Sequence, residues 1–407
     1  MKEVQQRVDA KDWRWLIVTL AFGYAVIVFG VATFSGISEQ NLLQGLGVPA
    51  LEHPFMDMRG VASWCEASAT GHDPSVEQTW INFPGEVPHP NYLMNYSPVV
   101  LCLAKLGLSQ HSVVTWSLAC GLIFSAALWF LCGSCSLTQA LIWTLMICSP
   151  SSVLLVERGN LDTLLFALIV VGLLLRRYPL AESGVILSAS LIKFFPIAAL
   201  LACWKEKGGR VPVILAATVF SLFLLFLSSR LASISGSLAG QFQSAFGCGV
   251  LTDILAHHGI IRGTQIPSVH GMVQFIAITV LGLSFITGWR FFRESMQHII
   301  SERSNHAFFL GAPIMLGLFL IGNQMDYKWV FFLLMVPAAL EFAERSDDIA
   351  TCVAKTWMVT MIFYSYWTFF SDEGSLRNAI LKQLLMWVVM LLTAFLAGRL
   401  WKCKSER

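Results

Sequence analysis

The residues best suited to chemistry lie in one short polar segment, Glu157-Arg158-Gly159-Asn160-Leu161-Asp162. This segment separates two long apolar stretches, residues 141–156 and 163–175. A charge at membrane depth costs about 3 kcal/mol or more, so ionisable groups there usually serve a function. An Arg, an Asn and two carboxylates in so short a segment favour a functional site. The alternative is a polar turn that joins two spanning helices.

A second candidate is Asp57, which precedes a helix expected over residues 61–70. Gly71 suits the C-terminal end of that helix, and Pro74 stops its continuation. An acid in the first turn is favoured by the helix dipole, and helix capping alone would also explain Asp57. Because the apolar residues of this helix share one face, we expect it to lie along the membrane surface.

A third candidate is Lys193, in the middle of the apolar segment 184–204 and shortly before Pro196. Proline disfavours helix in the residue before it and removes a backbone donor. Basic residues flank the segment on both sides. We therefore expect two half-helices that enter and leave on the same side of the membrane, with Lys193 near the tip. The alternative is one kinked helix whose lysine snorkels to the headgroups.

The composition defines the class of protein around these candidates. The chain has 407 residues, of which 56% are hydrophobic and 13% charged, with a mean hydropathy of +0.66. Soluble chains carry about 25% charged residues, and about 20 apolar residues cross a bilayer. We expect an all-α polytopic membrane protein, because the alternation of a membrane β-barrel is missing. No basic cluster suggests a nucleic-acid partner, and the cysteine spacing suggests no metal site.

Charge distribution indicates the topology. With the N-terminus in the cytoplasm, 17 Lys and Arg fall in cytoplasmic segments and 8 outside, as the positive-inside rule favours. Treating 184–204 as a full crossing would reverse every later loop. We therefore expect both termini in the cytoplasm, a single domain over 1–407, and outer loops 35–110 and 230–268 that cover the site. The ten full spans are expected near residues 15–34, 112–132, 137–156, 161–175, 211–229, 269–289, 307–322, 329–340, 350–370 and 380–400.

Several motifs, in this order, resemble the GT-C membrane glycosyltransferases, and glycosyltransferase family 87 in particular. The resemblance covers roughly residues 15–400. Its motifs are an acid in the first outer loop (Asp57), Gly71-His72-Asp73-Pro74, Asn95-Tyr96-Ser97-Pro98, the Arg-x-Asn-x-Asp element from Arg158 to Asp162, Lys193-Phe194-Phe195-Pro196, and Asp326-Tyr327-Lys328.

The resemblance implies a GT-C-type fold and a sugar-transferring enzyme, and we expect neither a cofactor nor a metal. Such an enzyme moves a hexose, mannose in most of the family, from a polyprenyl-phosphate sugar to a hydroxyl of a lipid-linked or glycan acceptor. A sugar hydroxyl needs a base within hydrogen-bond reach, and Asp57 is that candidate. The leaving phosphate needs fixed cations, for which Arg158 and Lys193, and more weakly Arg262 and Lys328, are candidates. Residues expected to bind sugar or acceptor, or to orient the cations, are Glu157, Asn160, Asp162, Tyr96, Asp326 and Tyr327.

Simpler explanations stay open for several of these residues. Arg158 and Asp162 are four apart and would pair along a helix end. Asp326 and Lys328 would serve as an interfacial anchor beside Tyr327. Cys65 and Cys248 both fall in outer loops and would form a disulfide in an oxidising compartment.

Three other functions are also compatible with the sequence. Broken helices with buried charges suit a secondary transporter. A polyprenyl-diphosphate-dependent polysaccharide polymerase or ligase has a similar span count. A non-catalytic subunit of a glycan assembly complex is the third. We expect the protein in a bacterial inner membrane, in contact with lipids and with its site on the outer face.

Overall fold

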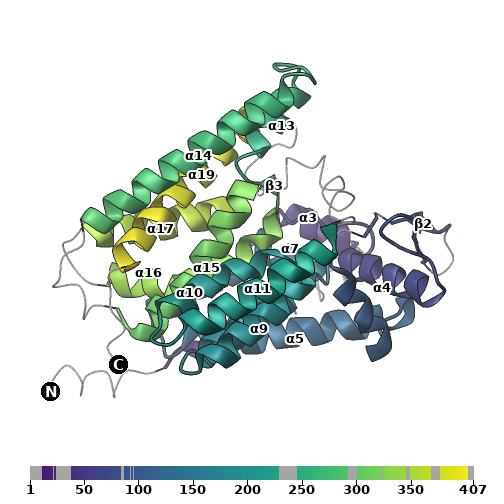
Figure 1. The fold of residues 1–407 in the computed structure, drawn as a ribbon, viewed down its shortest axis with the longest axis horizontal. Coiled ribbons are helices and arrows are strands. Elements are labelled where there is room, and N and C mark those ends of the chain that lie inside the picture. Colours follow the sequence, from purple (N-terminus) through teal and green to yellow (C-terminus); the bar gives the residue numbers. More distant parts are fainter. Residues whose placement is uncertain are drawn as a thin grey trace.

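The computed structural model describes residues 12–21, 23, 38–83, 87–91, 93–94, 96–228, 245–291, 300–321, 324–344, 349–367 and 376–401. Over these residues the protein is a body of packed helices (Figure 1). Its strands are two short antiparallel pairs, β1 (Trp80–Ile81) with β2 (His89–Pro90) and β3 (Ala245–Phe246) with β4 (Gln324–Met325). The all-α prediction is confirmed. Of the first expected span, residues 15–21 and 23 are helical, and residues 22 and 24–34 lie outside the described residues.

Several helices are long and apolar enough to cross a membrane. Among the described residues, four qualify: the segment Gln110–Cys132, which contains η2 (Gln110–Ser112) and α5 (Val113–Cys132), and the helices α14 (Ile266–Arg290), α15 (Glu302–Ile321) and α19 (Leu376–Trp401). A fifth results if α6 (Leu137–Ile147) and α7 (Pro150–Glu157), which meet at 55°, form one broken span. The protein is thus a membrane protein by helix length and composition. The figure of ten spans stays a prediction, because the remaining apolar helices are shorter.

The region before α5 is built from short elements. It contains α3 (Glu39–Gly45), α4 (Met56–Ala69) and the 3-10 helix η1 (Pro98–Leu106). Helix α4 begins five residues before the expected start at residue 61, so Asp57 lies inside its first turn. Gly71, with φ of +88°, follows the helix end as predicted. Apolar residues of α4 pack against η1 and α5 (cluster of Met58, Val61, Trp64, Val100, Val113 and Cys120).

The predicted break at Lys193 is present. Helix α8 (Asp162–Leu174) leads into α9 (Pro179–Ile192), which ends where Lys193 adopts an extended conformation. The chain continues through η3 (Phe195–Ala199), α10 (Leu200–Lys205) and α11 (Arg210–Phe226). Helix α9 packs against η3 and α10, so the two arms of this segment lie against one another. Whether both arms emerge on one side of a membrane remains a prediction.

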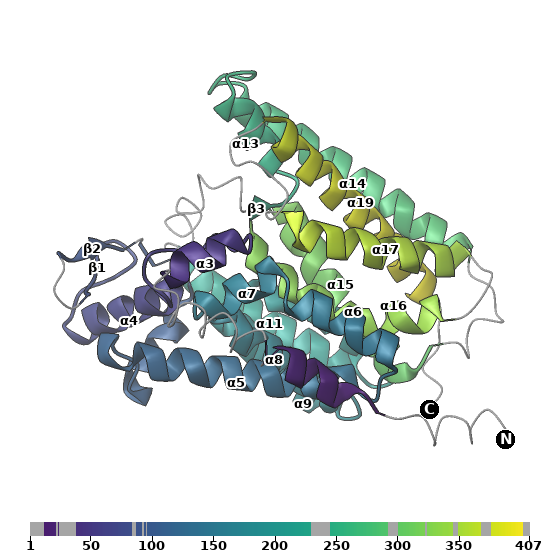
Figure 2. The same ribbon diagram turned by 180° about the vertical axis from the view of Figure 1, so that it is seen from behind.

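The C-terminal half contains α13 (Val250–His257), the 3-10 helix η7 (Asp326–Met335), α16 (Val336–Ala343) and α17 (Ile349–Ser365). Figure 2 shows α14 and α19 side by side along one edge of the molecule, with α13 near the end of the pair. Glycines allow this pairing. A Cβ at Gly288 or Gly398 would lie 2.0 Å from a backbone carbonyl oxygen of the opposite helix, and small residues are what permit such close helix contact in membranes.

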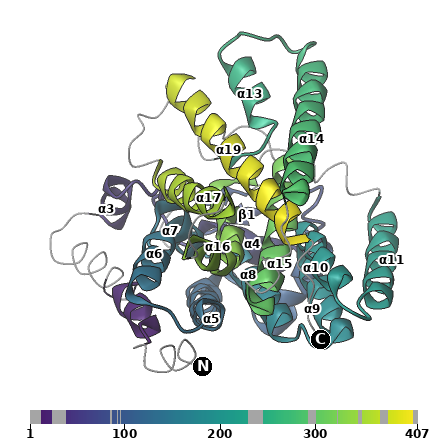
Figure 3. The same cartoon turned by 90° about the vertical axis from the view of Figure 1, so that its left-hand side faces the viewer.

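The remaining helices surround a common core. Figure 3 shows α15 and α8 inside the body, with α11 on one flank and α6 on the other. The largest cluster of buried side chains contains many aromatic residues, among them Trp143, Phe166, Phe319, Trp329 and Trp357. This core fixes the ends of α7, α8 and α9, which carry the polar residues described next.

Candidate functional site

The polar segment 157–162 forms a tight turn between α7 and α8. Gly159 has φ of +60°, and its amide donates to the Val156 carbonyl at 3.0 Å. The Asn160 amide donates to the Leu155 carbonyl at 3.2 Å. This is the pattern with which a left-handed residue closes a helix C-terminus. The turn therefore ends α7 and directs the chain at once into α8.

Close packing leaves room only for glycine at position 159. A Cβ there would lie 2.5 Å from Ser117 Oγ of α5 and 3.1 Å from Met58 Cβ of α4. A side chain would also be strained at this positive φ. The missing Cβ thus lets α4 and α5 approach the turn directly.

The N-terminus of α4 docks on the same turn. The Phe55 amide donates to the Glu157 carbonyl at 2.8 Å, and the Asp57 and Met58 amides donate to the Arg158 carbonyl at 3.1 and 3.3 Å. These are amides that a helix start leaves without an intrahelical acceptor. The first turn of α4 is therefore held against the end of α7, and Asp57 with it.

Asp57 is thereby joined to the polar segment. Asn160 Nδ2 donates to Asp57 Oδ2 at 2.5 Å, and Arg158 Nη1 lies 3.8 Å from Asp57 Oδ1. The Asp57 side chain is 24% exposed, whereas that of Glu157 is 5% exposed and that of Asp162 is fully buried. Of these three carboxylates, Asp57 is the one that an incoming molecule can reach.

Lys193 completes a network behind Asp57. Its Nζ donates to Asp162 Oδ1 at 2.7 Å and to Asn160 Oδ1 at 3.2 Å. The same Nζ lies 4.1 Å from the centre of the Tyr96 ring, a favourable cation–π distance. Asn160 Oδ1 also accepts the Asp162 amide at 2.8 Å. Asn160 thus connects the partly exposed carboxylate of Asp57 to the buried Lys193–Asp162 ion pair.

Arg158 makes looser contacts than Lys193. Its Nε lies 3.7 Å from Glu157 Oε2, and its contact with Asp57 is 3.8 Å long. Both distances exceed those of a hydrogen bond. The ion pair between Arg158 and Asp162 that their spacing predicts is not formed, because Asp162 pairs with Lys193. A guanidinium held loosely beside the partly exposed Asp57 has donors left for a ligand.

Lys328, at the start of η7, interacts electrostatically with Asp162 and Lys193 of this network. Its Nζ lies 5.2 Å from the Phe195 ring centre. Burial lowers the pKa of Lys328 to about 8, the charge of Asp162 raises it, and the charge of Lys193 lowers it. The structure therefore brings together Asp57, Arg158, Asn160, Asp162, Lys193 and Lys328, with Glu157 and Tyr96 at the edges.

Three candidates are placed elsewhere or are not described. Asp326 accepts a hydrogen bond from Tyr364 Oη at 3.1 Å and pairs with Lys382, so it joins η7 to α17 and α19. Arg262 is exposed in the loop between α13 and α14, where its amide bonds to Gln265 Oε1 at 3.0 Å. The side chain of Tyr327 lies outside the described part of the chain.

Some structural partners were not predicted from the sequence. Lys382 and Tyr364 bind Asp326, and Ser117 lies against Gly159. A lysine in the apolar helix α19 was a visible signal, because a membrane-depth charge needs a partner. Nothing in the sequence marks Ser117 among the other serines of apolar segments.

The predicted alternative of a disulfide is not present. Cys65 and Cys248 are free and buried. The Cys65 thiol lies 3.9 Å from the Val100 carbonyl and the Cys248 thiol 3.6 Å from the Leu320 carbonyl. In the part of the chain that the structure describes, no group of three or more His, Cys, Asp and Glu side chains is arranged to hold a metal ion.

Comparisons of the chain with protein-family models, with curated proteins and with solved structures find no match. The class that fold and site define is therefore a helical membrane protein with a buried cluster of acids and bases around one accessible carboxylate.

Proposed function

We propose that the protein is an integral-membrane glycosyltransferase with a GT-C-type fold. It transfers a hexose, mannose-like, from a polyprenyl-phosphate sugar to a hydroxyl of a lipid-linked or glycan acceptor. The observation that supports this most is the contact of Asn160 with Asp57, because it joins the accessible carboxylate, which also lies beside Arg158, to Lys193.

Asp57 acts as the base in this proposal. One Asp57 oxygen takes the proton of the acceptor hydroxyl while the hydroxyl oxygen attacks the anomeric carbon. The bond between that carbon and the phosphate oxygen breaks, and its electron pair leaves with the polyprenyl phosphate. A single displacement inverts the anomeric centre and needs only one carboxylate. The Asn160 amide donates to Asp57 Oδ2 and not to Oδ1. This hydrogen bond holds the Asp57 side chain in position.

Cations stabilise the leaving phosphate. Arg158 is the first candidate, because its pairs with Asp57 and Glu157 are longer than hydrogen bonds and a guanidinium binds phosphate in a bidentate manner. Lys328 is the second, since it faces the network from another element. Lys193 already bonds to Asp162 and Asn160, so we assign it to positioning Asn160. Asp326 and Arg262 take no direct part in this scheme.

The membrane arrangement follows the same proposal. The turn 157–162, the start of α4 and the start of η7 lie on the extracytoplasmic face of a bacterial inner membrane, and both termini lie in the cytoplasm. Together with the expected first span, the helices α8, α11 and α17 and the pair of η7 and α16 complete ten spans in tilted or broken form, whereas α9 and η3 are the two arms of the re-entrant segment.

A second candidate function is ion-coupled transport. Two buried Lys–Asp pairs, Lys193–Asp162 and Lys382–Asp326, lie among the membrane helices, and such pairs are found in proton and ion pathways. The two functions differ in product, because a transporter moves its substrate without forming a new glycan.

The decisive experiment uses purified protein with a radiolabelled polyprenyl-phosphate hexose and a membrane extract as acceptor. Asp57→Asn should abolish transfer, and Glu52→Gln should leave it unchanged, because Glu52 is exposed and lies in the same loop. Near-normal turnover by Asp57→Asn would show that Asp57 is not the catalytic base. Uptake into vesicles without a labelled glycan would favour the transporter.

A further inference from the structure

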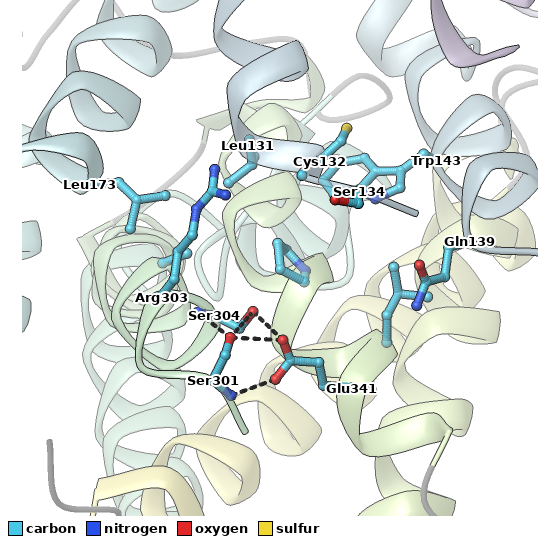
Figure 4. Close-up of a pocket in the computed structure, with 14 residues that line it drawn as sticks. Leu131, Cys132, Ser134, Gln139, Trp143, Leu173, Ser301, Arg303, Ser304 and Glu341 are labelled. Carbon is cyan, nitrogen blue, oxygen red and sulfur yellow. Dashed lines mark hydrogen bonds between the residues drawn. The ribbon is translucent and has the colours of Figure 1, made fainter. Parts of the chain in front are cut away.

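A pocket of about 190 Å³ lies at the opposite end of α8 from the candidate site. Asp162 begins α8 and belongs to that site, whereas Leu173, near the end of α8, lines the pocket. Leu173 is eleven residue steps after Asp162, which is roughly 16 Å along the helix axis. The pocket is formed where the end of α5, α6, the start of α15 and α16 meet (Figure 4). It is therefore distinct from the Asp57 site.

Opposite charges line this pocket without pairing with each other. Figure 4 shows the Arg303 guanidinium directed toward Leu131, while the Glu341 carboxylate is turned to Ser301 and Ser304. The hydrogen bond recorded for Arg303 goes to the backbone carbonyl of Phe130. Because this partner is neutral, the positive charge of Arg303 is not compensated in the described part of the wall.

The carboxylate is also held by neutral groups. Glu341 accepts from the Ser301 amide at 2.6 Å and from the hydroxyls of Ser301 and Ser304, each at 2.8 Å. These donors orient the carboxylate but leave its charge uncompensated. One small pocket thus presents a fixed cation and a fixed anion, and a complementary ligand carries one charge of each sign close together.

We infer that this pocket binds the headgroup of a zwitterionic aminophospholipid, with its phosphate at Arg303 and its primary ammonium at Glu341. A phosphate matches the forked donors of a guanidinium. An ammonium with N–H groups matches a carboxylate that already accepts short hydrogen bonds. A phosphoethanolamine headgroup joins both groups through two carbons, which suits a pocket of this small size. This inference is independent of the proposed sugar transfer.

Two observations favour a lipid over a soluble aminophosphate. The helices that form the wall carry exposed apolar side chains beside the lining residues, with Phe130 52% exposed, Leu137 44% and Leu141 47%. Acyl chains would lie against such surface. The charge of Arg176 also acts on Arg303, and arginines that gather at a membrane edge attract phosphate headgroups.

Native mass spectrometry of the full chain tests this site. The protein is exchanged into detergent with equal amounts of phosphatidylethanolamine, phosphatidylglycerol and phosphatidylcholine. We expect phosphatidylethanolamine to be retained most, because phosphatidylglycerol lacks the ammonium and phosphatidylcholine lacks its N–H donors. Arg303→Gln should lower the retention of both phosphatidylethanolamine and phosphatidylglycerol about tenfold, as for one lost charged contact. Glu341→Gln should lower only that of phosphatidylethanolamine.

Two matched control variants accompany this test, and two outcomes would contradict the inference. Arg290→Gln and Glu302→Gln remove the same charges at exposed positions outside the pocket, and retention should not change. Equal retention of the three lipids by the unmodified protein would overturn the inference, even if Glu341→Gln failed to fold. Displacement of the lipid by an equal concentration of soluble phosphoethanolamine would overturn the assignment to a lipid.

Discussion

Asn160 Nδ2 donates a hydrogen bond of 2.5 Å to Asp57 Oδ2, although the two residues are 103 positions apart in the chain. The same amide group accepts from Lys193 Nζ through its oxygen. Asn160 therefore transmits the position of the buried ion pair to the accessible carboxylate.

The first prediction concerns this amide. Asn160→Asp replaces the donor with a second carboxylate, which repels Asp57 and lets it turn away from its place. We expect kcat of sugar transfer to fall about 100-fold, the scale of a misplaced general base, with a smaller change in KM. Steady-state kinetics on labelled donor measures both, and circular dichroism checks the fold. An unchanged kcat would return Asn160 to a purely structural role.

The second prediction concerns the buried ion pair of Lys193 and Asp162. Lys193→Met alone leaves Asp162 buried without its partner, which should destabilise the protein by about 3–5 kcal/mol. The double variant Lys193→Met/Asp162→Leu removes both charges and should recover most of this loss. Thermal unfolding in detergent measures the shifts in Tm. If the double variant is less stable than the single one, the pair is not the source of the stability.

The third prediction uses the turn at Gly159. Gly159→Ala forces a Cβ to 2.5 Å from Ser117 Oγ and strains a positive φ, which costs about 1–3 kcal/mol at a non-glycine residue. We expect a lower Tm and weaker docking of α4. Gly121→Ala is the matched control, because a Cβ there meets Val156 Cγ1 only at 3.9 Å. Equal effects of the two variants would contradict the packing described for the turn.

The fourth prediction is a dependence of donor affinity on pH. With its pKa lowered to about 8, Lys328 is protonated at pH 7 and loses its charge as the pH rises through 8. Affinity for the donor phosphate should be constant below that pH and then fall, by at most about tenfold per pH unit. A phosphodiester donor keeps its single charge throughout this range, so it does not contribute.

Titration of donor binding between pH 6.5 and about 9.5 tests this dependence. The upper limit lies below the ordinary lysine pKa, so lysines with an ordinary pKa stay protonated over this range. Lys328→Arg should bind the donor equally at all these values, because arginine stays protonated. A fall of the same size in Lys328→Arg would assign the titration to another group.

The sequence by itself determined the helical membrane class. The chain has apolar segments long enough to span a membrane and a low share of charged residues. No other class of protein buries so much apolar surface. It also determined two local breaks, because Pro196 interrupts the helix near Lys193 and Gly71 closes α4. Both effects are local, so they can be predicted from short stretches of chain.

Tertiary structure decided which polar residues meet. The sequence pairs Arg158 with Asp162 by spacing, but packing of α9 against α8 brings Lys193 to Asp162 instead. Asp326 and Lys328 are two residues apart, yet one pairs with Lys382 in α19 and the other lies over the Phe195 ring and interacts electrostatically with Asp162. Ion pairs between distant segments depend on how helices pack, and helical periodicity alone does not contain that information.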